Sequence, residues 1–488
     1  MRRVNFLFLA AIVIAMMVSG GALCALHGYQ VRRHVSAMLD VARQAEASGD
    51  LDKAARFLTQ YVNLKPEDGP TYAWYARIVD EKTPARRRGE DLLAIYEEAL
   101  RHNLGDRTLE RKCAEIAMEP GIRRYPEALR HLTNVHDSLG ADSPNALEAA
   151  DLEDLLGQCQ EAISESGKAA ELYKGSIKKD PTRVATYARL AQLLQESLKR
   201  PEEADQTIKA MVKANPKSAL AHLDNYRYER EFHHQVDEAE LAQALKLGPD
   251  EADVLMAAAD LAFEKKDLRS ARKHIEHGLD RHPDQSVLYQ MAARLDQAEN
   301  HPDRALAVLR KGVEAIPDDG PLSFLLTEIL IDQGKLEGEE GAVAWVGRLE
   351  KLGLREGYDT FLEARLAMAR QDWAQAISKF EIVRSLLAND RVLMARVDLM
   401  LSDCYGKTGD QKHQTAALER AAGDETTASA ARPLLAQNLE RAGRLDEAVS
   451  QYLLIADARP ESRLDVVRVL LRKNAALPKA RQRWDEVE

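Results

Sequence analysis

The sequence predicts an all-α protein built from repeated helix–turn–helix units, and two observations lead to this prediction. An alanine is followed twelve residues later by a proline at six places in the 488-residue chain. Two copies are in strict register, because Ala271 and Pro283 recur thirty-four residues later as Ala305 and Pro317. The six pairs are Ala54/Pro66, Ala169/Pro181, Ala204/Pro216, Ala271/Pro283, Ala305/Pro317 and Ala448/Pro460. A fixed period of this size indicates an array of stacked repeats.

The stretch from Val254 to Pro283 shows what one unit requires. Apolar residues recur at helical spacing in its first half, a polar break follows at 265–267, and a second helix is expected from about Leu268 to Asp280. Pro283 ends that helix because proline cannot continue one. Ala271 is small where the two helices cross, and the bulky Ile275 fills the space one turn later. This bulky residue recurs as Leu58, Tyr173, Ile208, Ile275, Leu309 and Tyr452.

This pattern resembles the tetratricopeptide repeat. Units of that family carry a small residue in the first helix, alanine early in the second, a large apolar residue one turn later and a closing proline. The match is clear in six copies and degenerate in six more, centred near Ala99, Ala128, Ala239, Ala342, Ala376 and Ala416. The resemblance implies a right-handed α-solenoid of about twelve repeats over residues 35–475, with a helical tail at 476–488. The alternative is an irregular all-α bundle.

The first thirty-four residues differ from the rest and predict one transmembrane helix that precedes the solenoid. Val4 to Leu26 contains no charged residue, and this length is enough to span a bilayer. Tyr29 and then Arg32 and Arg33 follow, which is typical of an aromatic and basic membrane exit. We therefore expect a signal-anchor at 1–34 and a single-pass membrane protein with its body on the extracytoplasmic (periplasmic) side. A cleaved signal peptide and a lipoprotein attached through Cys24 remain alternatives.

Charge and motif content exclude several classes of function. Residues 1–45 hold five Arg/Lys and one acid, so the remainder carries −11 − 4 = −15. An acidic body argues against nucleic acid as a ligand, since phosphate binding needs clustered Lys and Arg. The cysteines form no CxxC pair, and no GxGxxG, HExxH or GxSxG signature occurs. We expect no cofactor, no metal, no small-molecule substrate and no catalytic activity.

The remaining prediction is a membrane-anchored scaffold or adaptor that binds protein or peptide partners. The resemblance implies that the first helix of each repeat lines a concave groove. Projected onto the better repeats, this face comprises Arg189, Asp224, Tyr228, Asp253, Asp260, Gln290, Arg294, Tyr358 and Arg365. One alternative is an accessory subunit or truncated part of a larger enzyme, such as those with glycosyltransferase- or kinase-linked repeats. Another is a cell-envelope assembly adaptor, although the CxxC module of such proteins is absent.

Overall fold

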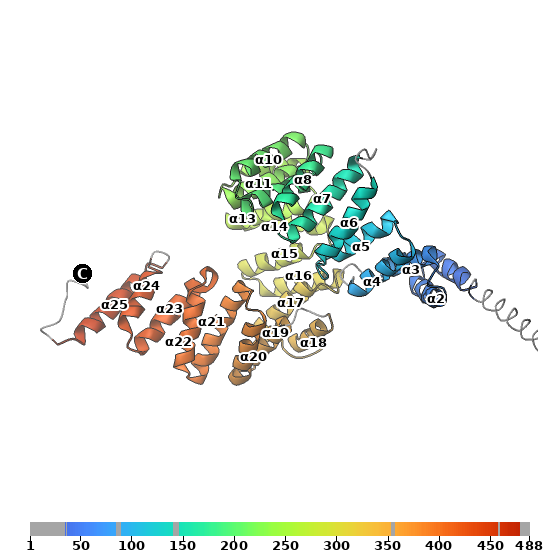
Figure 1. Cartoon of the computed structure of the whole chain (residues 1–488). Coiled ribbons are helices and arrows are strands. Elements are labelled where there is room, and N and C mark those ends of the chain that lie inside the picture. Colours follow the sequence, from blue (N-terminus) through green and yellow to red (C-terminus); the bar gives the residue numbers. More distant parts are fainter. Residues whose placement is uncertain are drawn as a thin grey trace, which may run out of the picture. The chain divides into compact units, whose positions relative to one another are not determined.

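The computed structural model of the chain describes residues 35, 37–83, 89–139, 146–352, 357–456 and 459–478. Within these ranges the chain forms helices and no strands (Figure 1). Helical residues 37–47 precede a series of helices whose bounds fall into two groups. The first group is α2 (Leu51–Leu64), α3 (Gly69–Lys82), α4 (Glu90–His102), α5 (Arg107–Met118), α6 (Tyr125–Leu139), α7 (Ala146–Ala162), α8 (Ser166–Lys179), α9 (Val184–Glu196), α10 (Pro201–Ala214), α11 (Ala219–Phe232) and α12 (Glu238–Leu247). The second group is α13 (Ala252–Glu264), α14 (Leu268–Arg281), α15 (Ser286–Ala298), α16 (Pro302–Ala315), α17 (Gly320–Asp332), α18 (Ala342–Leu352), α19 (Tyr358–Ala369), α20 (Trp373–Leu386), α21 (Arg391–Thr408), α22 (Gln411–Ala422), α23 (Glu425–Arg441), α24 (Leu445–Leu453) and α25 (Ser462–Ala475).

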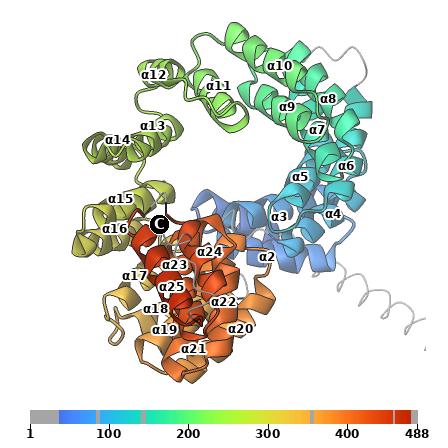
Figure 2. The same cartoon turned by 90° about the vertical axis from the view of Figure 1, so that its left-hand side faces the viewer.

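These two groups are two compact units, unit 1 up to Gly248 and unit 2 from Pro249. Within each unit every helix from α2 onward packs against the next one in sequence, as the successive hairpins of Figure 2 show. The odd-numbered helix of each hairpin is helix A, and the even-numbered one is helix B. Packing that involves mainly sequence neighbours is the physical definition of a repeat array. The predicted all-α repeat fold is confirmed.

The alanine and the bulky residue of each clear repeat lie in the core. All six alanines are 0% exposed, and the six bulky residues that follow them are at most 2% exposed. Five of the six prolines lie two residues beyond the end of their helix, as Pro283 does after Arg281. Pro460 is the exception, because α24 already ends at Leu453. The sequence pattern therefore reports a real packing position, where helix B crosses helix A and only a small side chain fits.

Two of the degenerate repeats were predicted in the wrong register. Ala239 is exposed at the start of α12, where Leu241 and Ala244 supply the buried contacts. This helix has only ten residues, and the position that alanine occupies in the clear repeats falls before its first residue. Ala416 is half-buried, whereas its neighbour Ala417 is fully buried. The remaining four, Ala99, Ala128, Ala342 and Ala376, are completely buried as expected.

The turn from helix A to helix B repeats a backbone conformation as well as a sequence pattern. One residue in the turn has a positive φ in most hairpins, and glycine occupies the position in some of them. The glycines are Gly49, Gly334, Gly409 and Gly443, and the other residues are Arg123, Ser164, Lys199, His234, Lys266, Asn300 and Gln371. Aspartate follows in several turns, as Asp267 does after Lys266, and its side chain accepts a hydrogen bond from the Ser270 amide. An aspartate cap satisfies an amide that has no partner within the helix.

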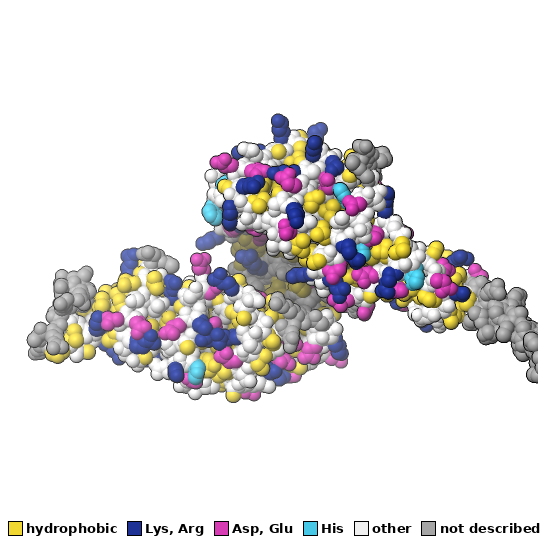
Figure 3. Space-filling model, viewed as in Figure 1, with side chains coloured by type: hydrophobic (Ala, Val, Ile, Leu, Met, Phe, Trp, Pro, Cys, Tyr) yellow, Lys and Arg dark blue, Asp and Glu magenta, His cyan; other side chains and the backbone are white. Residues whose placement is uncertain are grey.

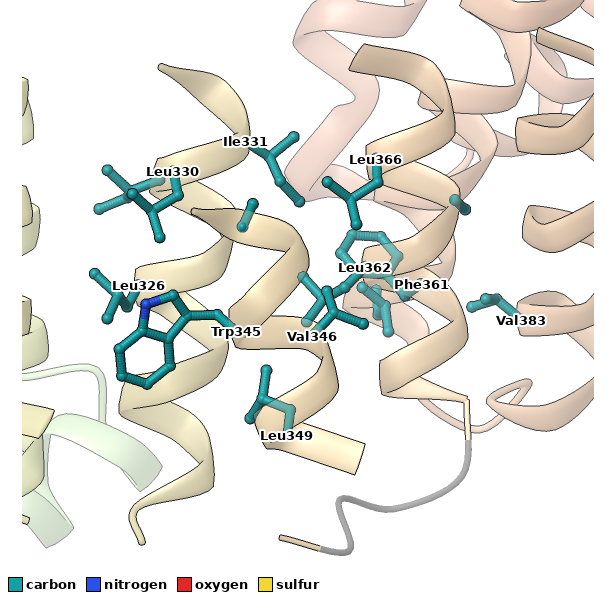
Figure 4. Close-up of a cluster of buried hydrophobic side chains, with 14 of the residues drawn as sticks. Leu326, Leu330, Ile331, Trp345, Val346, Leu349, Phe361, Leu362, Leu366 and Val383 are labelled. Atoms are coloured by element: carbon teal, nitrogen blue, oxygen red, sulfur yellow. The ribbon is translucent and has the colours of Figure 1, made fainter. Parts of the chain in front are cut away.

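One cluster of buried side chains in unit 2 runs from hairpin to hairpin between α15 and α22. Figure 4 shows Leu326 and Leu330 of α17, Trp345 and Val346 of α18, and Phe361 of α19 within one cluster of buried side chains. The cluster also includes apolar residues of α15, α16 and α20 to α22. Because each hairpin buries its apolar face only against its neighbours, the array positions its helix A faces as a set.

The prediction of a single-pass membrane protein is corrected. Its transmembrane segment, 1–34, lies outside the residues that the structure describes. Among the helices that are described, none combines the length and apolar character needed to cross a bilayer. The expected membrane localisation with an extracytoplasmic body therefore has no structural basis. The predicted helical tail at 476–488 stays a prediction, since α25 ends at Ala475 and residues 479–488 also lie outside the described ranges.

Candidate protein-interaction face

In unit 2 the predicted groove residues occupy a common register on helix A. Asp260, Arg294 and Arg365 each lie six residues before the positive-φ residue of their hairpin turn. Positions ten and thirteen residues before the turn share the same side, because spacings of three, four and seven residues repeat one face of a helix. We call these three positions the helix A face. Its members on α13 to α21 are Asp253, Met256, Asp260; Val287, Gln290, Arg294; Pro321, Phe324, Glu328; Tyr358, Phe361, Arg365; and Arg396, Leu399, Asp403.

Several residues of this face are exposed to solvent. Asp253, Asp260 and Arg294 are exposed, and Gln290 is half-buried. The guanidinium of Arg294 on α15 lies 5.3 Å from the centre of the Phe263 ring on α13, a cation–π contact between successive A helices. The charge on this part of the face is therefore mixed, with two carboxylates on α13 and a positioned arginine on α15.

Further along the face, Arg365 belongs to a buried charge network. Its guanidinium contacts Glu328 Oε1 at 3.4 Å and also pairs with Asp332, both on α17. Arg396 on α21 binds the same Glu328 oxygen at 2.5 Å. Glu328 is 8% exposed and Arg365 is 9% exposed. Removing one partner from such a buried pair typically costs about 3–5 kcal/mol, because the other charge remains desolvated. Glu328 of α17, bound by Arg365 of α19 and by Arg396 of α21, therefore links three A helices.

Tyr358 also contributes to packing between repeats. Its hydroxyl donates a 2.7 Å hydrogen bond to Asp390, the residue that caps α21. Its ring lies edge-on to Phe324 of α17 with 5.8 Å between ring centres. Glu328, Arg396 and Asp390 were not identified from the sequence. The first two lie in the same register as the predicted residues on neighbouring helices, so applying the register to the degenerate repeats would have found them.

The three predicted residues of unit 1 are also engaged within the array. Arg189 on α9 pairs with the buried Asp154 of α7 at 3.1 Å. Asp224 contacts Arg227 on its own helix at 3.6 Å.

Tyr228 is only 5% exposed. Its hydroxyl donates to Asp205 at 2.6 Å and accepts from Gln195 Nε2 at 2.6 Å. Burial, followed by the Asp205 hydrogen bond, raises the pKa of Tyr228. The structure thus places Tyr228 among packing residues.

The surface and the thiols give no sign of other chemistry. Figure 3 shows Lys/Arg and Asp/Glu side chains interspersed over the visible face, with both signs present along each run of helices. Among the described residues no group of three or more His, Cys, Asp or Glu is arranged to hold a metal. Cys113, Cys159 and Cys404 are buried, and burial raises the pKa of each thiol to about 12. These thiols therefore stay protonated and behave as small apolar side chains.

Comparison with known proteins finds similarity at the level of fold. No protein-family model and no curated protein sequence matches the chain. Yeast Tom70 is 15% identical over 87% of this chain and 97% of its own, with a TM-score of 0.41. The Cut9–Hcn1 structure gives 13% identity, 89% and 96% coverage and a TM-score of 0.36. MamA from Desulfovibrio magneticus RS-1 gives 14% identity, 37% of this chain, 95% of its own and a TM-score of 0.31.

These structures are tetratricopeptide-repeat proteins. Because their sequence identities and TM-scores with this chain are low, the repeat assignment rests on the chain's own hairpins. The resemblance to the tetratricopeptide repeat is confirmed by the buried alanine, the buried bulky residue and the closing proline in hairpin after hairpin.

Proposed function

We propose that the chain is a protein-interaction scaffold that uses the helix A face of unit 2 and has no catalysis of its own. The observation that carries this proposal is the recurrence of exposed charged side chains at the same register on three A helices of unit 2, α13, α15 and α21. Asp253, Asp260, Arg294 and Asp403 are all exposed at these positions. Solenoids present such faces as extended binding surfaces, because their repeats share one orientation. The right-handed course of the solenoid remains an expectation from the resemblance.

The residues suitable for a test follow from burial. Tyr228 and Arg365 are unsuitable because each is itself buried and bound to a neighbouring helix, so their removal would disturb the array itself. The four exposed residues named above, three acids and one arginine, can change to alanine together without opening the core. The matched control changes three exposed acids and one exposed arginine on helix B, namely Glu276, Asp280, Glu314 and Arg310.

The experiment compares captured proteins by quantitative mass spectrometry, using the full chain as bait. A partner of the helix A face is retained by the wild type and by the helix B control and is lost from the helix A variant. Circular dichroism of all three chains should coincide, because every substitution is on the surface. A partner retained by the helix A variant at wild-type level would place the binding site elsewhere. A turnover activity of the purified chain that survives in the variant would refute the scaffold role.

A further inference from the structure

A hollow of about 310 Å³ lies at the surface of unit 2 between α18, α19 and α20. Its floor is apolar, because Val346 of α18 is 6% exposed and Leu366 and Ala367 of α19 are 7% and 3% exposed. Both Val346 and Leu366 lie between these two helices in Figure 4. Gly347 of α18 borders the same hollow, and a Cβ placed there would meet no atom within 4 Å. The hollow is therefore open on the side where a longer side chain on α18 would fill it.

Glu350 borders this hollow at a position where the clear repeats carry an apolar residue. It follows Ala342, the buried alanine of α18, by eight residues. In the six clear repeats the residue eight positions after the alanine is Val62, Ile177, Val212, Leu279, Val313 or Ala456, and each of these is buried or half-buried. Glu350 is instead exposed. A carboxylate resists burial against apolar side chains, so this exchange leaves a charge beside the apolar floor.

The charges around the hollow leave one carboxylate without a partner. Lys379 binds Glu363 at 2.6 Å, and Arg370 binds Glu337 at 2.5 Å. Each of the two cations that line the hollow is therefore matched by a carboxylate. The Glu350 side chain forms no ion pair or hydrogen bond within the part of the chain that the structure describes. Three carboxylates against two cations leave a net charge of −1 at the hollow, and Glu350 carries it.

We infer that this hollow binds an arginine side chain of a partner protein. The methylene stem of the arginine would cover the apolar floor, and its guanidinium would pair with the Glu350 carboxylate. Arginine packs its stem along apolar surface while it keeps its charged head in water at the rim. Its planar guanidinium also binds a carboxylate through two parallel hydrogen bonds, which the ammonium of lysine does not. The site goes beyond the helix A face, because α18 and α20 are B helices.

Burial and charge favour this occupant over two others. An aliphatic side chain would cover the floor, but it would also desolvate Glu350 without giving the carboxylate a partner. An anion would need a free cation, whereas Lys379 and Arg370 are each bound by a carboxylate. An arginine satisfies both the apolar floor and the unpaired charge beside it.

The test titrates N-acetyl-arginine amide into the full chain, whose leucine and valine methyl groups are labelled with ¹³C. The NMR signals of Val346 and Leu366 should shift saturably, because the arginine stem lies against these side chains. N-acetyl-citrulline amide has nearly the same shape but no charge, and it should bind about fivefold more weakly. N-acetyl-norleucine amide offers an apolar side chain of similar length and should also bind about fivefold more weakly.

Two variants locate the site at positions where a new side chain does not disturb the core. Glu350→Gln removes the charge from an exposed position and should weaken the arginine amide about fivefold, with no effect on the citrulline amide. Gly347→Leu fills the hollow from α18 and should abolish binding, and it replaces a helical glycine by a better helix former. The matched controls are Glu314→Gln on α16 and Gly167→Leu on α8, at an exposed carboxylate and an exposed helical glycine away from the hollow. Both controls should bind like the wild type.

Several outcomes would overturn the inference. The Val346 and Leu366 signals would stay unshifted, or the arginine and citrulline amides would bind the wild type equally. Unchanged binding by Gly347→Leu would place the arginine elsewhere on the chain, and loss of binding in Glu314→Gln would reveal a general attraction to an acidic protein. Tighter binding of the norleucine amide, abolished by Gly347→Leu, would assign the hollow to an apolar side chain. None of these results bears on the partner-capture experiment with the helix A variant, so the scaffold proposal stands or falls separately.

Discussion

The left-handed turn residue between helix A and helix B allows a sharp test with two adjacent lysines. Lys266 has φ +58°, and Lys265 beside it has φ −74°. Both side chains are exposed. Changing either lysine to glycine removes the same atoms and the same charge, so the two variants differ mainly in the backbone conformation that glycine must adopt.

The expected free energies of unfolding differ in sign. A non-glycine residue in the left-handed region costs about 1–2 kcal/mol, which glycine avoids. Glycine loses more conformational entropy on folding, about 0.5–1 kcal/mol relative to alanine. Lys266→Gly should therefore stabilise unit 2 by about 0–1.5 kcal/mol. Gly334, Gly409 and Gly443 already occupy the same place in other hairpins. Lys265→Gly should destabilise it by about 0.5–1 kcal/mol, since it gains no relief of strain.

Urea unfolding followed by circular dichroism at 222 nm measures both variants against the wild type. The two free energies should differ by about 0.5–2.5 kcal/mol, the sum of the two effects. In thermal unfolding this is a separation of several degrees, since 1 kcal/mol shifts Tm by about 2–4 °C in a unit of this size. Equal stability of the two variants, or a lower stability of Lys266→Gly, would refute the account of the turn.

Three further predictions concern packing and charge. Ala305→Arg should destabilise unit 2 by more than the roughly 1–3 kcal/mol that is typical of overpacking, because the position is 0% exposed and the substitution also buries a charge. The control Arg304→Ala, at an exposed position, should change stability by less than about 0.5 kcal/mol. Similar unfolding midpoints of the two variants would contradict the repeat register. Gly157→Ala should destabilise unit 1, because the new Cβ would lie 2.5 Å from Tyr173 Cε1. Gly347→Ala, where the new Cβ meets no atom within 4 Å, should stabilise unit 2 by up to about 1 kcal/mol. A rise of the urea unfolding midpoint in both variants would be inconsistent with close packing at Gly157. The Arg468 hydrogen bond holds the pKa of Glu440 below its ordinary value, so the stability it contributes is present above about pH 4.3 and is lost as pH falls through the lowered pKa. Glu440→Gln should therefore cost about 1–2 kcal/mol near pH 7 and progressively less below pH 4, and a cost independent of pH would argue against this pairing.

The sequence alone determined the repeat unit. Alanine, a bulky residue and proline at fixed spacing are local requirements of one helix crossing another, so Ala271, Ile275 and Pro283 are legible without coordinates. The same reading failed where the local pattern shifted. Ala239 lies at the start of a shortened helix, and Ala416 is one residue from the buried position. Periodicity predicts spacing well but leaves the phase of an irregular repeat open.

Tertiary structure decided which predicted face residues are free to bind. Arg365 and Arg294 are both arginines six residues before their turns, yet Arg365 is buried against Glu328 and Arg294 is exposed. The difference comes from the neighbouring helices, since α17 presents a carboxylate beside Arg365 and α13 presents the Phe263 ring beside Arg294. The partners of a side chain in a solenoid lie a full repeat away in the sequence. The burial of a side chain therefore depends on how adjacent repeats stack. The sequence pattern within one repeat carries no information about that stacking.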